Sequence, residues 1–244
     1  MSTVGLVLCI CVLVPNLVFG GTTLKTKDLS IPVQVNTKAL VSALATNATD
    51  VPSFNEYADS ILEDLKEYSI TYGLDPVELE DIVEEFQWKV LLITYKGQLT
   101  LTNGWMQGLS TIYRTDDVTV TLSDRNFNIA VPVSLEFLLI DYKYSAKFMG
   151  LGPQGTINAR ITGIDFLLNL GLNSETNDFT LNSIDIQNTG NIKLKFGGNV
   201  LTDWLINIFS NVVTRVFRRV IVEVLEGNFS EIFQYVLDII NRSN

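Results

Sequence analysis

Carboxylates are the most numerous groups in this sequence that could carry out chemistry. Asp and Glu together number 27, His is absent, and the two cysteines, Cys9 and Cys11, lie close to the start of the chain. The rest of the chain therefore lacks the usual general base, the commonest zinc ligand and the thiolate nucleophile. A pair of carboxylates could still hydrolyse a glycosidic bond. Because no nucleophile elbow or phosphate-binding loop is present, we expect no catalytic residues and no cofactor.

The densest group of carboxylates lies in "DPVELEDIVEE", residues 75–85. A calcium site would need the alternating oxygen ligands and turn glycine of an EF-hand loop, and both are missing. Asp75 before Pro76, with Glu78 three residues after the aspartate, instead predicts the N-cap and capping box of a short solvated helix. We therefore expect no metal site.

The formal net charge of −10 limits the classes of partner. No basic patch with interleaved aromatic residues occurs, which argues against a nucleic acid partner. An acidic surface also argues against constitutive adsorption to anionic membranes. Arg215, Arg218 and Arg219 could hold a ligand carboxylate or phosphate, or could be solvated and paired with Glu223.

Residues 1–20 resemble a secretory signal peptide, because an apolar run without charged side chains ends in small residues. The alternative is an uncleaved membrane anchor, but Pro15 and Asn16 interrupt a run that is already short for a bilayer. We predict a secreted chain with an N-terminal arm at 21–52, a single domain at 53–244 and no stable membrane anchor. Possible glycosylation sites are Asn47, Asn228 and Asn241.

Helical periodicity marks both ends of the predicted domain. Ser53 and Glu56 form a capping box before an amphipathic segment that reaches residue 71. In residues 200–225 apolar pairs recur every four residues, so the apolar stripe drifts by about 40° per step around the helix. A helix with such a stripe needs partners on several sides. A further amphipathic helix follows Gly227.

Between these helices the apolar period changes to two, from about Phe86 to Phe196. The runs "NFNIAVPVSLEFLL" and "IDYKYSAKFM" alternate clearly and predict long antiparallel strands in a meander. Pro132 predicts an edge or a bulge in its strand. A sheet with one apolar face and a helix with a winding stripe fit together if the sheet curls around the helix. The predicted fold class is α+β, with a long helix wrapped by a highly curved antiparallel sheet.

The stretches "YKGQLTLTNGWMQGLSTIYR" (95–114) and "FTLNSIDIQNTGNIKLKFGGNVLTDWLINIF" (179–209), with the long final helix, resemble the group 7 dust-mite allergens. The resemblance extends over about Phe54 to Phe233. Those proteins belong to a wider group with bactericidal/permeability-increasing, juvenile-hormone-binding and takeout proteins. The resemblance implies a sheet wrapped around a long helix with an apolar cavity for lipids. Juvenile-hormone-binding and takeout proteins typically carry disulfide cysteines near the N-terminus, and the predicted mature chain has no cysteine, because Cys9 and Cys11 lie in the signal-peptide-like segment. This difference favours the cysteine-poor group 7 branch.

We expect a non-enzymatic carrier of small hydrophobic ligands, such as a lipid, a fatty acid or a terpenoid hormone. The partner could also be a microbial lipid or lipopeptide. The candidate cavity residues are apolar residues of the final helix and the strands: Trp204, Ile208, Phe209, Val212, Val216, Phe217, Val131, Val133, Phe137, Tyr142, Tyr144 and Phe148. The candidate gate residues lie beside glycines: Met149, Leu151, Trp105 and Met106.

Two alternatives stay open from the sequence alone. Each candidate cavity residue could be close-packed core, and the gate segments could be a bulge and a hairpin corner with inward apolar residues. The whole protein could instead be an extracellular protein-interaction module, or an innate-immune recognition module for microbial lipids, with little or no internal cavity. The size of the internal cavity distinguishes a carrier from such a module.

Overall fold

The computed structural model describes residues 17–19, 22–24, 54–71, 73–90, 92–123, 126–148, 151–198 and 203–242. The chain divides into two units, Met1–Pro32 and Val33–Asn244. In the first unit, β1 (Leu17–Phe19) pairs antiparallel with β2 (Thr22–Leu24). The predicted cleavage point after Gly20 and most of the predicted arm lie outside the described residues. All further description concerns the second unit.

In the described part of the second unit, nine strands form one sheet. Their bounds are β3 (Val77–Leu79), β4 (Ile82–Val90), β5 (Ile93–Gln107), β6 (Ile112–Arg114), β7 (Thr119–Ser123), β8 (Asn126–Leu135), β9 (Leu138–Phe148), β10 (Gln154–Asn173) and β11 (Phe179–Gly198). β3 and β4 pair with the same edge of β5, one after the other, and the other edge of β5 pairs with β9. β6 and β7 both pair with β8. β8 and β9 lie end to end along β10, which pairs with β11. All of these pairings are antiparallel, as predicted. The predicted meander holds only in part, because β5 pairs with β9 and β8 pairs with β10, so the strands do not follow one another in chain order across the sheet.

A single bend crosses the sheet and divides it into two halves. The break between β5 and β6, at η1 (Leu109–Thr111), lies beside the break between β8 and β9 at residues 136–137, because Glu136 N donates to Thr111 O at 3.3 Å. Gly108, Gly163 and Gly190, in or next to three different strands, have φ values of 115°, 72° and 81°. Only glycine adopts such angles freely, so these residues let the strands turn where the sheet curls.

Pro132 lies inside β8, opposite Leu167 of β10. On the other side of β8, β6 pairs as far as Val133 and β7 begins at Ala130, so Pro132 falls between them. Its carbonyl accepts a hydrogen bond from Thr115 N at 3.0 Å on that side. The missing N–H of proline therefore faces a gap in the strand pairing, which is how the sheet tolerates this residue.

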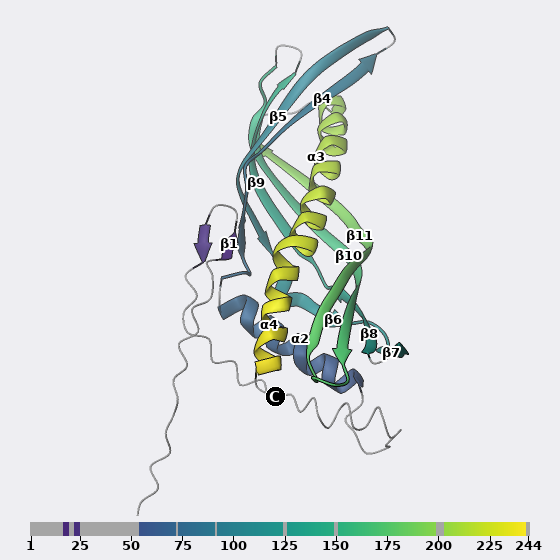
Figure 1. The fold of residues 1–244 in the computed structure, drawn as a ribbon. Helices are drawn as coiled ribbons and strands as arrows, with labels where there is room; N and C mark the ends of the chain where they lie inside the picture. The colour runs from purple at the N-terminus through teal and green to yellow at the C-terminus, as the bar shows by residue number, and fades with distance from the viewer. Residues whose placement is uncertain are drawn as a thin grey trace, which may run out of the picture. The chain divides into compact units, whose positions relative to one another are not determined.

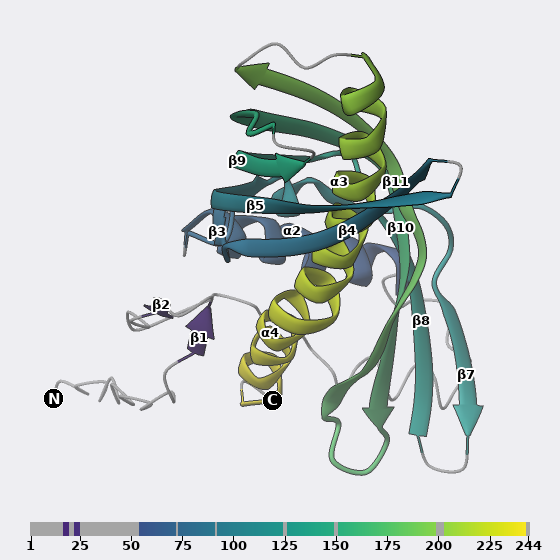
Figure 2. The same cartoon turned by 90° about the horizontal axis from the view of Figure 1, so that it is seen from above.

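One continuous helical rod runs along the hollow of the sheet (Figure 2). It consists of α3 (Asp203–Glu223), the π-helical segment η2 (Val224–Phe229) and α4 (Ser230–Arg242). The apolar pairs from Ile208/Phe209 to Val224/Leu225 are all buried, so the winding stripe does contact the sheet along its length. The sequence bounded the long helix at Gly227 and predicted a further helix after it, and α4 confirms the further helix. The chain nevertheless stays helical through Gly227, which lies in the π segment. The wider π turn contains Gly227 and rotates less per residue, so it sets the drifting stripe back without ending the helix.

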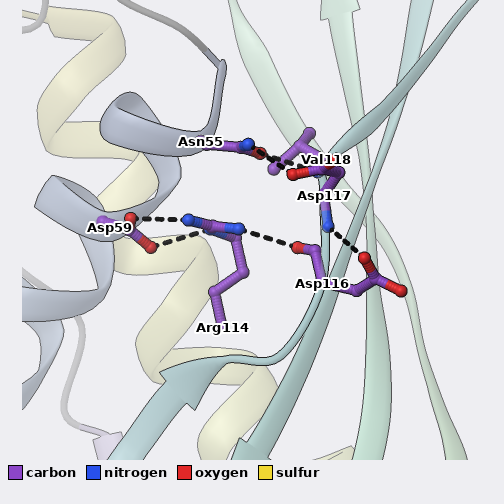
Figure 3. Close-up of polar contacts among 6 residues, drawn as sticks. All are labelled: Asn55, Asp59, Arg114, Asp116, Asp117 and Val118. Atoms are coloured by element: carbon purple, nitrogen blue, oxygen red, sulfur yellow. Dashed lines mark hydrogen bonds and ion pairs between the residues drawn. The ribbon is translucent and has the colours of Figure 1, made fainter.

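Helix α2 (Phe54–Thr71) covers the lower half of the unit, below the bend, beside α4 (Figure 1). Ala58, Ile61, Leu62 and Leu65 form its buried face. A polar network fixes the helix to the segment between β6 and β7 (Figure 3). Arg114 donates two hydrogen bonds of 2.8 Å to the carboxylate of Asp59, and Asn55 Oδ1 accepts from Val118 N at 2.8 Å.

The predicted short helix at residues 75–85 was wrong, because this segment forms β3 and the start of β4. Val77 and Leu79 are buried and Glu78 is exposed, a period of two that packs these apolar residues against the core. Asp75 does not cap a helix. Its carboxylate accepts hydrogen bonds from Gly108 N at 2.7 Å and Ser110 N at 2.8 Å, and so holds η1 in place.

Candidate functional site

A groove of about 880 Å³ lies between the β4–β5 hairpin and the first half of α3. Phe86, Trp88 and Gly97 line it from the hairpin, and Ile208 and Val212 line it from the helix. The remaining lining residues are polar: Glu85, Gln87, Lys96, Gln98, Lys147, Asn211 and Arg215. Strand alternation places the side chains of Glu85, Gln87, Lys96, Gln98 and Lys147 on the sheet face that points away from α3. The surface that the hairpin presents to α3 is therefore mainly apolar.

An aromatic cluster closes the inner end of this groove. The ring of Phe86 stacks on Phe148, with centroids 5.4 Å apart, and meets Phe209 edge-on at 5.8 Å. Gly97 lies opposite Phe86 in the strand pairing, and a Cβ atom there would come within 2.3 Å of the Phe86 ring. The absence of a side chain at Gly97 lets the Phe86 ring lie over the backbone. The cluster gives the groove a rigid apolar end.

Arginine side chains of α3 lie beside the groove and share one carboxylate. Glu84 of β4 lies 3.1 Å from Arg219 and 3.6 Å from Arg215. Arg219 also lies 3.9 Å from Glu223. Arg215 lines the groove, its side chain is 63% exposed, and its ion-pair partner is shared with another guanidinium. Arg215 is therefore the cationic group of α3 best placed to meet an anionic group in the groove.

Two of the twelve candidate cavity residues, Ile208 and Val212, line this groove. Phe217, Tyr142 and most others are packed into the core instead: Phe217 is 0% exposed and stacks on Tyr142 with centroids 5.9 Å apart. The hydroxyl of Tyr142 donates to Glu80 O at 2.9 Å, and its pKa is raised by burial and then by the nearby charges of Asp81, Glu80 and Glu223. The other buried candidates are Phe209, Val216, Val131, Val133, Tyr144 and Phe148, while Phe137 is half-buried. The side chain of Trp204 lies outside the described residues.

A second, small cavity of about 30 Å³ lies under α2. Its lining is apolar and includes Tyr57 and Ile61 of α2, Val131 of β8 and Phe233 of α4. The volume equals about one water molecule's share of the liquid. Within the described part of the chain, the hydroxyl of Tyr57 is buried without a hydrogen-bond partner, and burial raises its pKa.

The candidate gate residues lie at different depths. Met106 is fully buried, Trp105 is 47% exposed and Leu151 is 48% exposed. Leu151 forms two backbone hydrogen bonds of 2.9 Å with Phe148, which close the corner between β9 and β10. Met149 lies outside the described residues. None of the described gate residues lines either cavity.

The predicted glycosylation sites differ in their surroundings. Asn47 and the side chain of Asn228 lie outside the described residues. Asn241 Oδ1 accepts a hydrogen bond from Phe179 N at 2.7 Å, and its Nδ2 donates to Phe179 O at 2.8 Å. A glycan would attach to the same Nδ2 atom, so modification of Asn241 would compete with this contact between α4 and β11.

Phe86, Trp88, Gly97 and Asn211 line the groove but were not among the candidates from sequence. Trp88 and Phe86 do show a signal, because they alternate with Glu85, Gln87 and Lys89 at a strand period. The sequence does not show which strand residue faces which helix residue, so the groove could not be assembled from it.

Within the described residues, no cluster of three or more His, Cys, Asp or Glu side chains is arranged to hold a metal ion. In the same part of the chain, no helix is both long enough and apolar enough to cross a membrane.

A large antiparallel sheet with a long C-terminal helix in its hollow defines an α+β class, and the groove lies between these two parts. The family model described as "Group 7 allergen" matches residues 53–237. This chain therefore belongs to the group 7 allergen family, and the resemblance seen in its sequence is confirmed.

Two mite proteins are similar to this chain in sequence. Mite allergen Der p 7 of Dermatophagoides pteronyssinus is 26% identical over 147 residues, which cover 59% of this chain and 67% of that protein. Mite allergen Der f 7 of Dermatophagoides farinae is 23% identical over 147 residues, covering 59% of this chain and 68% of that protein.

Two solved structures are similar at lower identity. The lipopolysaccharide binding protein matches with a TM-score of 0.46 and 17% identity, over 77% of this chain and 38% of that chain. Takeout 1 of Epiphyas postvittana matches with a TM-score of 0.29 and 15% identity, over 70% of this chain and 78% of that chain. This chain thus spans well under half the length of the lipopolysaccharide binding protein.

Proposed function

We propose that this protein is a secreted, non-enzymatic binder and carrier of small amphipathic lipids, and that the groove between the β4–β5 hairpin and α3 is the binding site. The observation that carries the proposal is the groove itself, with a volume of about 880 Å³ and an apolar face beside Arg215. This volume suits a lipid-sized molecule, since ligand sites in proteins span about 300–1,000 Å³.

The lining of the groove supports an amphipathic ligand rather than a purely apolar one. Phe86, Trp88, Ile208 and Val212 offer apolar surface to a hydrocarbon tail, and burial of such surface contributes about 25 cal/mol per Å². Arg215 offers a charged donor to a carboxylate or phosphate head. Membership of the group 7 allergen family is consistent with this role.

A fluorescent fatty-acid probe tests the proposal on delipidated protein. Asn211→Trp places a large side chain in the groove at an exposed position of α3 and should weaken probe binding at least tenfold. Asn207→Trp is the matched control, since Asn207 is exposed one turn earlier and does not line the groove. Wild-type protein that takes up no probe would contradict the proposal and favour an interaction module.

Removing the charge of Arg215 tests whether the protein recognises the charged head group of the ligand, separately from burial of the hydrocarbon tail. Arg215→Gln should weaken binding of an anionic fatty-acid probe about tenfold, because a charge-assisted hydrogen bond is lost. Binding of the corresponding uncharged alcohol should change little. If both probes lose affinity equally, Arg215 does not contact the head group.

A further inference from the structure

The tip of the β4–β5 hairpin exposes apolar side chains. Leu92 is 95% exposed and Ile93 is 57% exposed. The pairing of β5 with β9 starts only at Gly97, so the hairpin projects beyond the rest of the sheet (Figure 1). Apolar residues gathered at a projecting tip are typical of an interaction site rather than of scattered surface residues.

Cations lie on the sheet face that points away from α3, from Lys96 near this tip to Arg160 and Lys193 near the bend. They are exposed residues of β5, β9, β10 and β11, and strand alternation places them together on the outward face. These residues are Lys96, Lys143, Lys147, Arg160, Lys193 and Lys195. The strand positions around them also carry the carboxylates of Glu78, Glu85 and Asp141. Asp141 also accepts a hydrogen bond from Asn158.

The charge of this face is opposite in sign to the net charge of the whole molecule. The chain has a formal net charge of −10, and its acidic groups include Glu56, Asp59, Glu63 and Glu67 of α2 in the lower half. The guanidinium of Arg160 lies 4.6 Å from the centre of the Phe137 ring, which keeps this cation on the outward face. The outward face therefore carries more cations than carboxylates, which the net charge of the chain conceals.

We infer that the β4–β5 hairpin and the adjoining outward face dock on an anionic lipid surface. Leu92 and Ile93 enter the boundary between head groups and acyl chains, and Lys89, which is exposed on the hairpin, meets lipid phosphates together with the cations of the outward face. The apolar tip favours a lipid surface over a soluble polyanion, since a polyanion would use the cations alone.

Docking does not depend on the proposed function, although it would bring the groove to a membrane. The groove lies between the hairpin and α3. The side chains of the cations point away from α3, including those of Lys96 and Lys147, whose strand positions border the groove. Asn211→Trp, which fills the groove, should leave vesicle binding unchanged. The failure of one proposal can therefore be distinguished from the failure of the other.

Insertion of the tip is tested with a single environment-sensitive dye. In a full chain with Cys9→Ser and Cys11→Ser, the dye is attached to Leu92→Cys or, as a control, to Leu122→Cys. Leu122 is 66% exposed on β7, at the opposite end of the unit (Figure 1). Vesicles of phosphatidylserine and phosphatidylcholine should raise dye emission several-fold at position 92 and leave position 122 unchanged. No response at position 92, or equal responses at both positions, would overturn the inference.

The electrostatic part is tested by vesicle flotation at physiological salt. The double variant Lys89→Gln/Lys143→Gln should lower partitioning onto anionic vesicles about 25-fold, since each surface lysine contributes about fivefold. Arg242→Gln, in the last turn of α4, is the matched control and should have no effect. Equal binding to pure phosphatidylcholine vesicles would overturn the inference. Binding to soluble heparin that survives Leu92→Asp, without vesicle binding, would assign the face to a polyanion instead.

Discussion

Asp64 carries its carboxylate in surroundings that disfavour its charge. Its pKa is raised by burial on α2 and then by the charges of Glu67 and Glu63. Because the pKa in the folded state lies above that in the unfolded state, this group stabilises the fold when protonated at low pH. That contribution is lost as the pH rises through the folded-state pKa, so Asp64 disfavours folding at neutral pH.

Asp64→Asn should therefore raise the melting temperature at pH 7. The gain should shrink as the pH falls and vanish where Asp64 of the wild type is itself protonated. Thermal unfolding followed by circular dichroism across pH 3–8 measures this difference. A gain that is the same at every pH would contradict the assigned cause.

Phe217 tests whether the upper core is close-packed. The residue is 0% exposed and stacks on Tyr142. Phe217→Ala should lower the free energy of unfolding by about 3–5 kcal/mol, because it removes buried surface and leaves a cavity. Val83→Ala, at a position 60% exposed, should change it by less than about 0.5 kcal/mol in urea denaturation. A small loss for Phe217→Ala would indicate a loose interior that could itself hold a ligand.

At the level of elements, the bend in the sheet depends on glycines whose surroundings differ. Gly108 has φ 115°, and a Cβ atom there would lie 2.3 Å from the carbonyl oxygen of Phe137. Gly163 has φ 72° but open space within 4 Å. Gly108→Ala should therefore destabilise the protein by more than about 3 kcal/mol, and Gly163→Ala by about 1 kcal/mol. Equal losses in chemical denaturation would show that overlap with Phe137 does not matter.

The elements that could be predicted from sequence are those with long, regular periods. Residues 200–225 and the runs around Val131 and Tyr142 gave a helix and strands with the correct buried faces. The helix predicted for residues 75–85 was wrong. Asp75, Pro76 and Glu78 fit the pattern of a capping box, but burial of Val77 and Leu79 favours a strand there. The sequence also did not show that the chain stays helical at Gly227, which lies in a π turn between α3 and α4.

At the scale of the whole unit, the ion pair between Arg114 and Asp59 links α2 to the sheet. The side chains of Arg114 and Asp59 are 18% and 51% exposed, and their two hydrogen bonds link elements distant in sequence. Arg114→Ala should speed amide hydrogen exchange in residues 54–71 about fivefold, because a bidentate pair contributes about 1 kcal/mol. Lys66→Ala removes the exposed pair with Glu63 on the same helix and should change exchange less than twofold. Equal effects would mean that Arg114 does not hold α2 on the sheet.

The candidate site was harder to predict than the fold. Ile208 and Val212 were among the candidates because they belong to the apolar stripe. Phe217 and Tyr142 belong to the same patterns, yet they pack against each other. Periodicity shows which side of an element is buried, but it does not show where two elements separate enough to leave space. That depends on the projection of the β4–β5 hairpin and on the position of the bend, which arise from pairing across the whole sheet.

Photochemical labelling tests the central claim, lipid binding in the groove, most directly. A fatty acid with a photoreactive group on its tail is bound to delipidated protein, irradiated and located by peptide mass spectrometry. The groove predicts adducts in residues 82–98 of the hairpin and 206–215 of α3, with labelling suppressed by excess unlabelled fatty acid and by Asn211→Trp. Saturable adducts confined to the lower half, at residues 126–135 or 164–173, would contradict the groove and point to the cavity under α2.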